Sequence, residues 1–335
     1  MNKVIWILSF LASFILSLGA TYLVIRLSKK LKSQQTILHY VEEHKSKQGT
    51  ATMGGIAFIL STLMVSLIAN GFHTYWLMGL AVGTAFGLLG FLDDFIKIKY
   101  KQNLGLRPYQ KIIGQFGIAI ILAVYVYFFS GLGGRIILPF SLRMVDIGFW
   151  VIPLIIVLCL ALTNAVNLTD GLDGLASNVS VYYFIFTLII MAIITRNQFN
   201  LAESESIISG YRSLMVLVIS LMGGLMAFLV FNTNKASIFM GDVGSLAIGG
   251  YASAVACLMG MELFVPILGI MFVVTTLSDI IQVLHYKRTH RRVFLMAPLH
   301  HHFQKKGHSE AKIVFCYSIV TILAGLLNLL FIFIS

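Results

Sequence analysis

The sequence predicts an all-α integral membrane protein, built as a single polytopic domain over residues 1–335. Hydrophobic residues make up 58% of the chain and charged residues only 11%, whereas a soluble domain carries roughly 25% charged residues. The hydrophobic residues gather into runs of about 20, the length that a helix needs to cross a bilayer. No segment between two runs is long enough to form a soluble domain of useful size.

About ten of these apolar runs have the length of a transmembrane helix. They lie near residues 4–27, 53–70, 75–92, 112–130, 147–163, 178–195, 213–231, 244–260, 263–285 and 312–334. The first run exceeds the apolar part of a signal peptide, so we expect it to be retained as the first span. Each cysteine lies inside an apolar run, which argues against a disulfide framework or a zinc site.

The basic residues predict which side of the membrane each connection faces. Ten spans put both termini on one side. Basic connections mark the cytoplasmic face, and the five odd-numbered connections hold most of the 24 Lys and Arg residues. The exceptions are Lys3, Arg135, Arg143, Arg196 and Arg212. We therefore expect the termini outside and the five odd-numbered connections in the cytoplasm.

The polar motifs of the chain all fall on this predicted cytoplasmic side. They are KQGTATMGG at 47–55, the pair Asp93–Asp94 opening the second inner loop, NAVNLTDGLDGLA at 164–176, FNTNKASIFMGDVGS at 231–245 and APLHHHF at 297–303. Carboxylates at the end of a span are costly to keep and usually functional. The outer connections carry only scattered carboxylates. We therefore expect one active site, assembled from five loops at the cytoplasmic membrane surface.

The carboxylates of these loops indicate a hard-metal site. Five of them lie near span ends, namely Asp93, Asp94, Asp170, Asp173 and Asp242. Oxygen ligands favour Mg²⁺ or Mn²⁺ over zinc, and Mg²⁺ fills its shell with water and substrate phosphate. Glycines on both sides of Asp242 leave backbone N–H groups accessible to a phosphate. Metal-assisted phosphoryl transfer is the reaction class that fits best.

Simpler interpretations of the same residues stay open. Asp93 and Asp94 point roughly 100° apart on a helix, so at most one is expected to face a given ligand, and the pair can be a plain span end. A helix through 164–176 would put Asn167, Asp170 and Asp173 on one face, but the segment can also be an acidic turn. Membrane topology and anionic lipids explain most of the basic residues. The sequence contains neither a Walker A loop nor GxGxxG.

Five ordered motifs, GTATMGG, GFLDDFIKI, NAVNLTDGLDGLA, FMGDVGSLAIGG and APLHHHF, resemble the cytoplasmic motifs of a known family. That family is the polyprenyl-phosphate N-acetylhexosamine-1-phosphate transferases, whose members also have ten spans. Within it, GTATMGG and PLHHHF are similar to the members that use a MurNAc-pentapeptide donor. The chain departs from the family at Ala51 (usually proline), Val243 (usually threonine) and Thr275 (usually glutamate, with Asp279 one turn later).

The resemblance implies a specific reaction and its partners. It implies Mg²⁺-dependent transfer of phospho-MurNAc-pentapeptide from UDP-MurNAc-pentapeptide to undecaprenyl phosphate, giving lipid I and UMP. This is the first membrane step of peptidoglycan synthesis, and it implies a multi-pass protein of the bacterial plasma (inner) membrane. The lipid bilayer is then a partner, no nucleic acid is expected to bind, and a homodimer is left open.

The resemblance also implies residue roles. Asp93, Asp94 and Asp242 match catalytic positions, and Asp242 matches the Mg²⁺ ligand. The matched substrate-binding positions are Lys47, Thr52, Lys101, Lys111, Asn167, Asp170, Asp173, Asn232, Phe239, Gly241, His300, His301 and His302. The histidine segment follows Pro298, which suggests a loop at its start, and we expect it to line the donor side. We expect Asp93 to deprotonate or orient the lipid phosphate, while a covalent aspartyl intermediate stays open.

Two other functions are alternatives. A sister transferase would use another UDP-N-acetylhexosamine with the same chemistry, although the HHH sequence argues against it. An ion-coupled transporter would use an acid within a span, such as Asp279. A transporter needs polar groups at mid-membrane, whereas the motifs here gather at one face.

Overall fold

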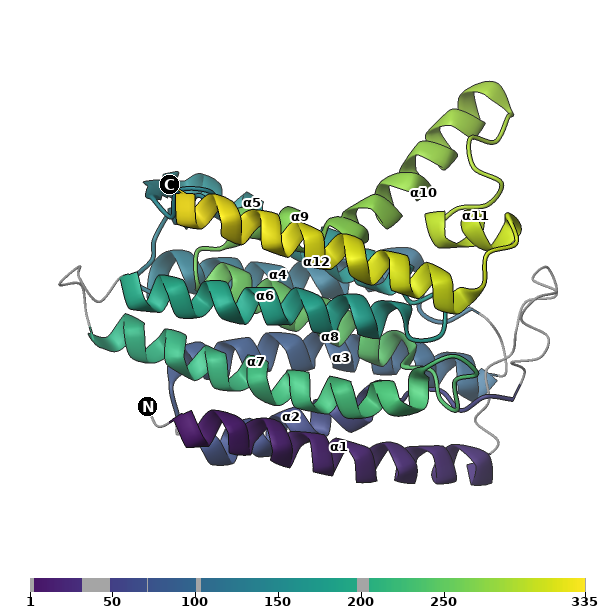
Figure 1. Cartoon of the computed structure of the whole chain (residues 1–335), viewed down its shortest axis with the longest axis horizontal. Coiled ribbons are helices and arrows are strands. Elements are labelled where there is room, and N and C mark those ends of the chain that lie inside the picture. The colour runs from purple at the N-terminus through teal and green to yellow at the C-terminus, as the bar shows by residue number, and fades with distance from the viewer. Residues whose placement is uncertain (1–2, 32–48, 71, 101–103, 198–204, 335) are drawn as a thin grey trace.

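The computed structural model describes residues 3–31, 49–70, 72–100, 104–197 and 205–334. Nearly all of them belong to long helices that lie side by side (Figure 1). The helices are α1 (Lys3–Leu31), α2 (Gly55–Ala69), α3 (Thr74–Tyr100), α4 (Pro108–Phe129), α5 (Val151–Thr169), α6 (Leu175–Asn197), α7 (Glu205–Asn232), α8 (Gly241–Leu258), α9 (Val265–Leu268), α10 (Ile270–Thr289), α11 (Leu299–Lys305) and α12 (Glu310–Ile334). An antiparallel hairpin of β1 (Arg135–Ile137) and β2 (Met144–Asp146) joins α4 to α5.

The helices confirm the all-α membrane class. Within the described ranges, eight helices are long and apolar enough to cross a membrane, and α9 with α10 makes a ninth if this bent pair counts as one span. The two helices of that pair meet at an angle of 79°. Helix α2 is apolar but has only 15 residues, fewer than the roughly 20 of a full crossing. Each of the ten predicted runs therefore corresponds to a helix or to this bent pair.

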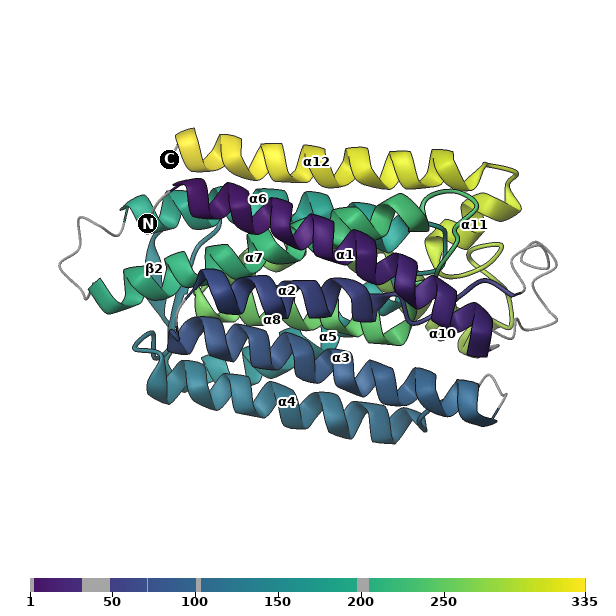
Figure 2. The same cartoon turned by 90° about the horizontal axis from the view of Figure 1, so that it is seen from below.

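The start of α1 and the end of α12 lie at the same end of the bundle (Figures 1 and 2). The described parts of all five motifs lie at the opposite end, which we call the motif end. Helix α10 slants away from the bundle toward this end, and α11 lies near its tip (Figure 1). This arrangement matches an even number of crossings, while the side of the membrane that the motif end faces stays a prediction.

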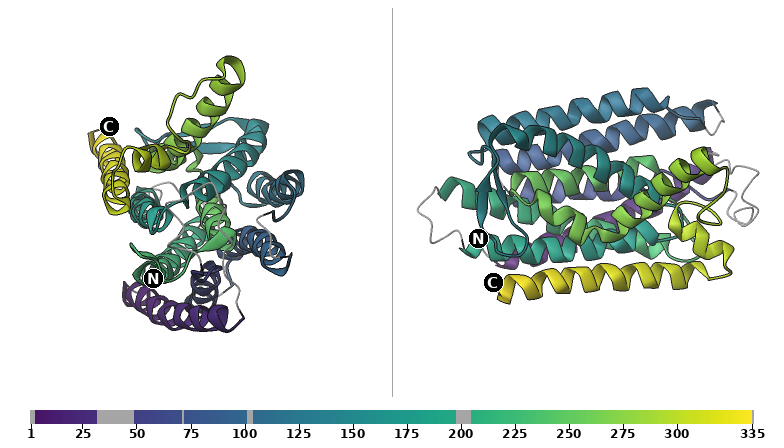
Figure 3. Two further views of the ribbon diagram at one scale, coloured as in Figure 1. Left: turned by 90° about the vertical axis from the view of Figure 1, so that its right-hand side faces the viewer. Right: turned by 90° about the horizontal axis from the view of Figure 1, so that it is seen from above.

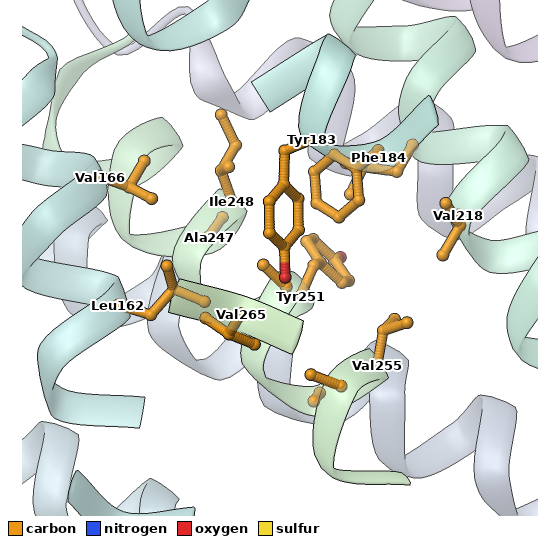
Figure 4. Close-up of a cluster of buried hydrophobic side chains, with 14 of the residues drawn as sticks. Leu162, Val166, Tyr183, Phe184, Val218, Ala247, Ile248, Tyr251, Val255 and Val265 are labelled. Atoms are coloured by element: carbon orange, nitrogen blue, oxygen red, sulfur yellow. The ribbon is translucent and has the colours of Figure 1, made fainter. Parts of the chain in front are cut away.

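Helix α8 forms the centre of the bundle (Figure 3). Every residue from Val243 to Leu258 is buried. Its glycines, alanines and serines let neighbouring helices approach closely, as small residues do at helix contacts in membranes. A Cβ on Gly83 of α3 would lie 2.1 Å from the ring of Tyr251. Figure 4 shows Tyr251 beside Tyr183 and other apolar side chains from α5, α6 and α7.

The start of α8 is fixed by contacts with the segment that leads into α2. The amides of Gly54 and Gly55 donate to the carbonyls of Phe239 (2.9 Å) and Met240 (3.0 Å). The amide of Phe239 donates in return to the carbonyl of Ala51 at 2.8 Å. A Cβ on Gly55 would lie only 2.2 Å from the Cα of Gly244. The two backbones thus touch, and GTATMGG positions the first turn of α8.

We expect Gly55→Ala to destabilise the protein, because neither backbone at this contact can move aside. Overpacking of this kind costs about 1–3 kcal/mol, which thermal unfolding in detergent measures as a lower Tm. Gly19→Ala is the control, since a Cβ there meets nothing within 4 Å. Equal Tm values for the two variants would contradict the close contact.

Candidate active site

Three carboxylates meet at the motif end. Asp93 and Asp94 lie on α3, Asp242 lies in the first turn of α8, and one oxygen from each lies within 4.8 Å of the others. Asp93 and Asp94 are only 3% and 6% exposed. The expectation that at most one of the adjacent pair faces a common ligand is wrong, because both side chains reach the oxygen of Asp242. Asp93 and Asp94 also do not open a loop, since α3 continues to Tyr100.

Each carboxylate is held by a separate hydrogen bond. The amide of Leu106 donates to Oδ1 of Asp93 at 2.8 Å, and the amide of Val243 donates to Oδ2 of Asp94 at 3.1 Å. Asn167 donates through Nδ2 to Oδ1 of Asp242 at 2.8 Å. Four segments of the chain therefore converge on one cluster, which we call the carboxylate cluster.

Gly241 has to be a glycine where α8 begins. Its φ is +72°, in the left-handed region that side chains avoid. A Cβ there would also lie 2.4 Å from Oδ2 of Asp94. Gly241 therefore allows α3 and the start of α8 to come together, and its predicted place in the site has a physical basis.

Two lysines offset the charge of the carboxylate cluster. Lys97 forms an ion pair with Asp93 and lies 3.5 Å from Asp94 and 3.1 Å from Asp242. Lys111, on α4, lies 2.9 Å from Asp242. The motifs pointed to Lys111 and missed Lys97. The missing signal was the helical spacing, because Lys97 follows Asp93 by four residues and Asp94 by three.

The donor set of the carboxylate cluster fits Mg²⁺. The groups that could act as ligands are carboxylate oxygens, the ligand type that this ion prefers. The three carboxylates carry more negative charge than the two lysines offset, and this excess favours binding of a divalent cation. Asp93, Asp94 and Asp242 are the residues that could hold the ion.

The acidic segment 164–176 forms a helix end and a turn. Helix α5 ends at Thr169, and the turn contains Gly174 with φ +73°. A single helix through 164–176 is therefore wrong. The buried carboxylate of Asp173 accepts a hydrogen bond from the amide of Ala236 at 3.0 Å. Burial raises the pKa of Asp170 well above its ordinary range, and the negative charge of Asp242 adds to this rise.

The three histidines lie in α11, so the segment is a short helix after the extended Pro298. Our expectation of a loop holds only for the residues before Leu299. His300 is buried against Gly171, where a Cβ would lie 2.2 Å from its Nε2. His301 contacts Gln304 through Nδ1 at 2.7 Å. Consecutive helical positions point in different directions, and His300 is the histidine that packs against Gly171 in the acidic turn.

The other predicted substrate positions lie around the same end. Asn232 is buried, accepts from the hydroxyl of Ser177 at 2.9 Å and donates to the carbonyl of Ile238 at 2.9 Å. Phe239 and Thr52 are half-buried near the paired segments of α2 and α8. Lys47 and Lys101 lie outside the described residues.

Comparison with known proteins decides the family. A model of glycosyl transferase family 4 matches residues 76–261, more than half of the chain. The chain belongs to glycosyl transferase family 4. The phospho-N-acetylmuramoyl-pentapeptide-transferase of Thermoanaerobacter sp. (strain X514) is 40% identical over 326 residues, 96% of this chain and 97% of that protein. The protein of that name from Desulforamulus reducens is 40% identical over 336 residues (98% and 95%). That of Clostridium botulinum (strain Alaska E43 / Type E3) is 44% identical over 283 residues (84% and 82%).

These near full-length relatives place the chain among the phospho-N-acetylmuramoyl-pentapeptide transferases of glycosyl transferase family 4. The resemblance drawn from the five motifs is thereby confirmed. The region that the family model matches includes the carboxylate cluster, the acidic turn and the start of α8. Helix α11 lies beyond it, and the relatives cover that part.

We expect the Lys97→Met variant to bind Mg²⁺ more tightly than the wild type. The Lys97 ammonium contacts all three carboxylates and competes with a cation for their oxygens. Isothermal calorimetry with Mg²⁺ alone measures the change in Kd. Lys99→Met is the matched control, because Lys99 lies over the rings of Phe95 and Tyr100. Unchanged or weaker Mg²⁺ binding by Lys97→Met would refute the competition.

We expect the hydrogen bond between the Leu295 amide and the His302 ring to weaken as the pH falls. The Leu295 amide donates to Nδ1 of His302 at 3.0 Å, which requires that nitrogen to be unprotonated. Partial burial and the charge of Lys306 lower the pKa of His302. The unfolded chain then takes up this proton more readily, so the stabilisation is complete above about pH 6.5 and is lost as the pH falls through the folded pKa.

The measurement is Tm against pH for the wild type and His302→Ala. The difference in Tm between the two proteins should shrink on acidification, while all other titrating groups contribute equally to both. A difference that stays constant with pH would show that the bond does not depend on a neutral ring.

Proposed function

We propose that this chain transfers phospho-MurNAc-pentapeptide from UDP-MurNAc-pentapeptide to undecaprenyl phosphate, releasing UMP and leaving lipid I in the bacterial plasma membrane. The names of the full-length relatives support this assignment. The observation that carries it is the carboxylate cluster with Lys97 and Lys111 at one end of an apolar bundle. A lipid phosphate from the membrane and a water-soluble nucleotide sugar can both reach such a place.

The reaction joins two anionic partners, so neutralisation of charge is the main task of the site. The lysines offset the negative charge of the diphosphate. Lys97 is 31% exposed in its side chain and Lys111 18%, so both remain accessible to a substrate. Mg²⁺ held by Asp242 would supply further positive charge to the diphosphate.

Asp93 is the group that we assign to the acceptor. An oxygen of the lipid phosphate attacks the sugar-side phosphorus, the bond from that phosphorus to the UMP oxygen breaks, and UMP leaves. Any proton on the acceptor phosphate passes to the Asp93 carboxylate. The Leu106 amide and Lys97 hold this carboxylate in place.

Asp94 is assigned a positioning role. One of its oxygens accepts from the Val243 amide and lies against Gly241, so it fixes the start of α8 and thereby Asp242. Direct attack needs no covalent enzyme intermediate, and the firmly held Asp93 suits a base better than a nucleophile.

The alternatives fit the geometry less well. The carboxylates lie at the end of the bundle, where a transporter's ion site is not expected. A sister transferase would keep the carboxylate cluster and differ at the donor sugar. The placement of His300 against Gly171 puts the triple histidine beside the acidic turn, which supports a role for α11 on the donor side.

The experiment that tests the reaction is release of UMP by the purified full-length chain. We expect release from UDP-MurNAc-pentapeptide only when undecaprenyl phosphate and Mg²⁺ are both present. Release from UDP-N-acetylglucosamine instead would support the sister transferase.

We expect Asp242→Asn to keep the fold and lose nearly all turnover. An amide is a poorer ligand for Mg²⁺, and losses on the order of 10²–10³ in rate follow the removal of such electrostatic groups. UMP release across a Mg²⁺ titration measures the effect. Glu205→Gln, at the exposed start of α7, is the control. Near-normal turnover by Asp242→Asn at every Mg²⁺ concentration would exclude Asp242 as the metal ligand.

A further inference from the structure

A cavity lies between α10, α11 and α12, three helices that Figure 1 shows near one another. Its volume is about 350 Å³, within the roughly 300–1,000 Å³ of ligand sites. The wall is apolar and includes Met271, Leu299, Phe303, Ile313, Tyr317 and Val320. None of these residues has a place in the reaction derived above.

The lining of the cavity is almost entirely apolar, and two nitrogen-bearing side chains border it. Lys312 lines it from the first turn of α12, and His308 lines it just before that helix begins. Val320, two turns further on, lies about 12 Å along the helix from Lys312 at 1.5 Å per residue. His308 and Lys312 are both exposed, so the basic mouth of the cavity opens at the motif end.

An apolar groove bordered by basic side chains at a membrane surface matches an amphiphile that carries a negative head group. Juxtamembrane basic residues attract anionic lipids of the adjacent leaflet. The carboxylate nearest in sequence, Glu310, accepts hydrogen bonds from the Asp173 amide (3.4 Å) and from Gln304 (3.3 Å) instead. We propose that this cavity binds one acyl chain of an anionic phospholipid, with its phosphate at Lys312 and His308.

The bound lipid is distinct from the lipid that reacts. Leu299 and Phe303 are four residues apart and face the cavity together, whereas His300 faces Gly171 in the acidic turn. Helix α11 therefore separates the cavity from the carboxylate cluster. A phosphate at Lys312 lies behind that helix, where the reacting groups do not reach.

A lipid in this cavity supports α11 from the side opposite the site. The helix is tied to the acidic turn through a chain of contacts from His301 to Gln304, from Gln304 to Glu310 and from Glu310 to the Asp173 amide. A lipid that fills the apolar space beside Leu299 and Phe303 would keep α11 in the position that these contacts require. The lipid thus acts as a structural partner of the histidine helix.

A native cysteine provides the test. Cys316 lines the cavity and is exposed, while Cys159 and Cys257 are buried. The full chain is placed in nanodiscs of phosphatidylcholine alone or with phosphatidylglycerol, and the rate of maleimide labelling at Cys316 is measured. Phosphatidylglycerol should slow labelling several-fold, Lys312→Glu should abolish the protection, and Val320→Trp, which fills the apolar end, should abolish the dependence on lipid.

The matched control is Lys287→Glu, which makes the same charge change at the exposed end of α10. It should keep the protection, and Tm values verify that each variant is folded. Equal labelling in both lipid mixtures, or equal loss of protection in the two charge variants, would overturn the proposal. So would protection by undecaprenyl phosphate without phosphatidylglycerol, or protection that depends only on protein concentration, which would indicate a second copy. The readout does not use turnover, so it is independent of the proposed reaction.

Discussion

The bond between Asp94 and the amide of Val243 is the contact on which the site depends. It joins α3 to the first turn of α8, where backbone N–H groups are unsatisfied within the helix and attract a carboxylate. Gly241 makes the approach sterically allowed, and Gly90 of α3 leaves no room for a Cβ beside the carbonyl of Asp242. The contact between these two helices fixes the position of Asp242 next to Asp93.

That close approach has an electrostatic cost, because three carboxylates are brought within 4.8 Å of one another. Like charges at this distance oppose ionisation, and burial opposes it further. Lys97 and Lys111 offset part of the repulsion, and Asn167 offers a neutral donor to the remaining oxygen of Asp242. A site that stays short of positive charge in this way is suited to bind a divalent cation together with substrate phosphate.

The sequence predicted the bundle and most of this cluster, and its errors have physical causes. Hydropathy detects the part of a helix that lies in lipid, so it ended the third span near residue 92. The helix continues to Tyr100, because hydrogen bonding and the pairing of Asp93 with Lys97 do not depend on hydropathy. Lys97 was overlooked for a related reason, since membrane topology alone already explained basic residues there. The contact between Gly55 and Gly244 joins segments far apart in the chain, and composition cannot predict such a pairing.

The three histidines of α11 make different contacts, although they are consecutive in the sequence. Three consecutive histidines on a helix point in three directions, so the motif cannot act as one binding surface. His300 fits against Gly171, His301 meets Gln304, and His302 accepts from the Leu295 amide. The His301 contact lies within α11, and the His302 contact joins α11 to the segment before it. The His300 contact joins α11 to the acidic turn. The contacts of the motif thus place a short helix beside the acidic turn.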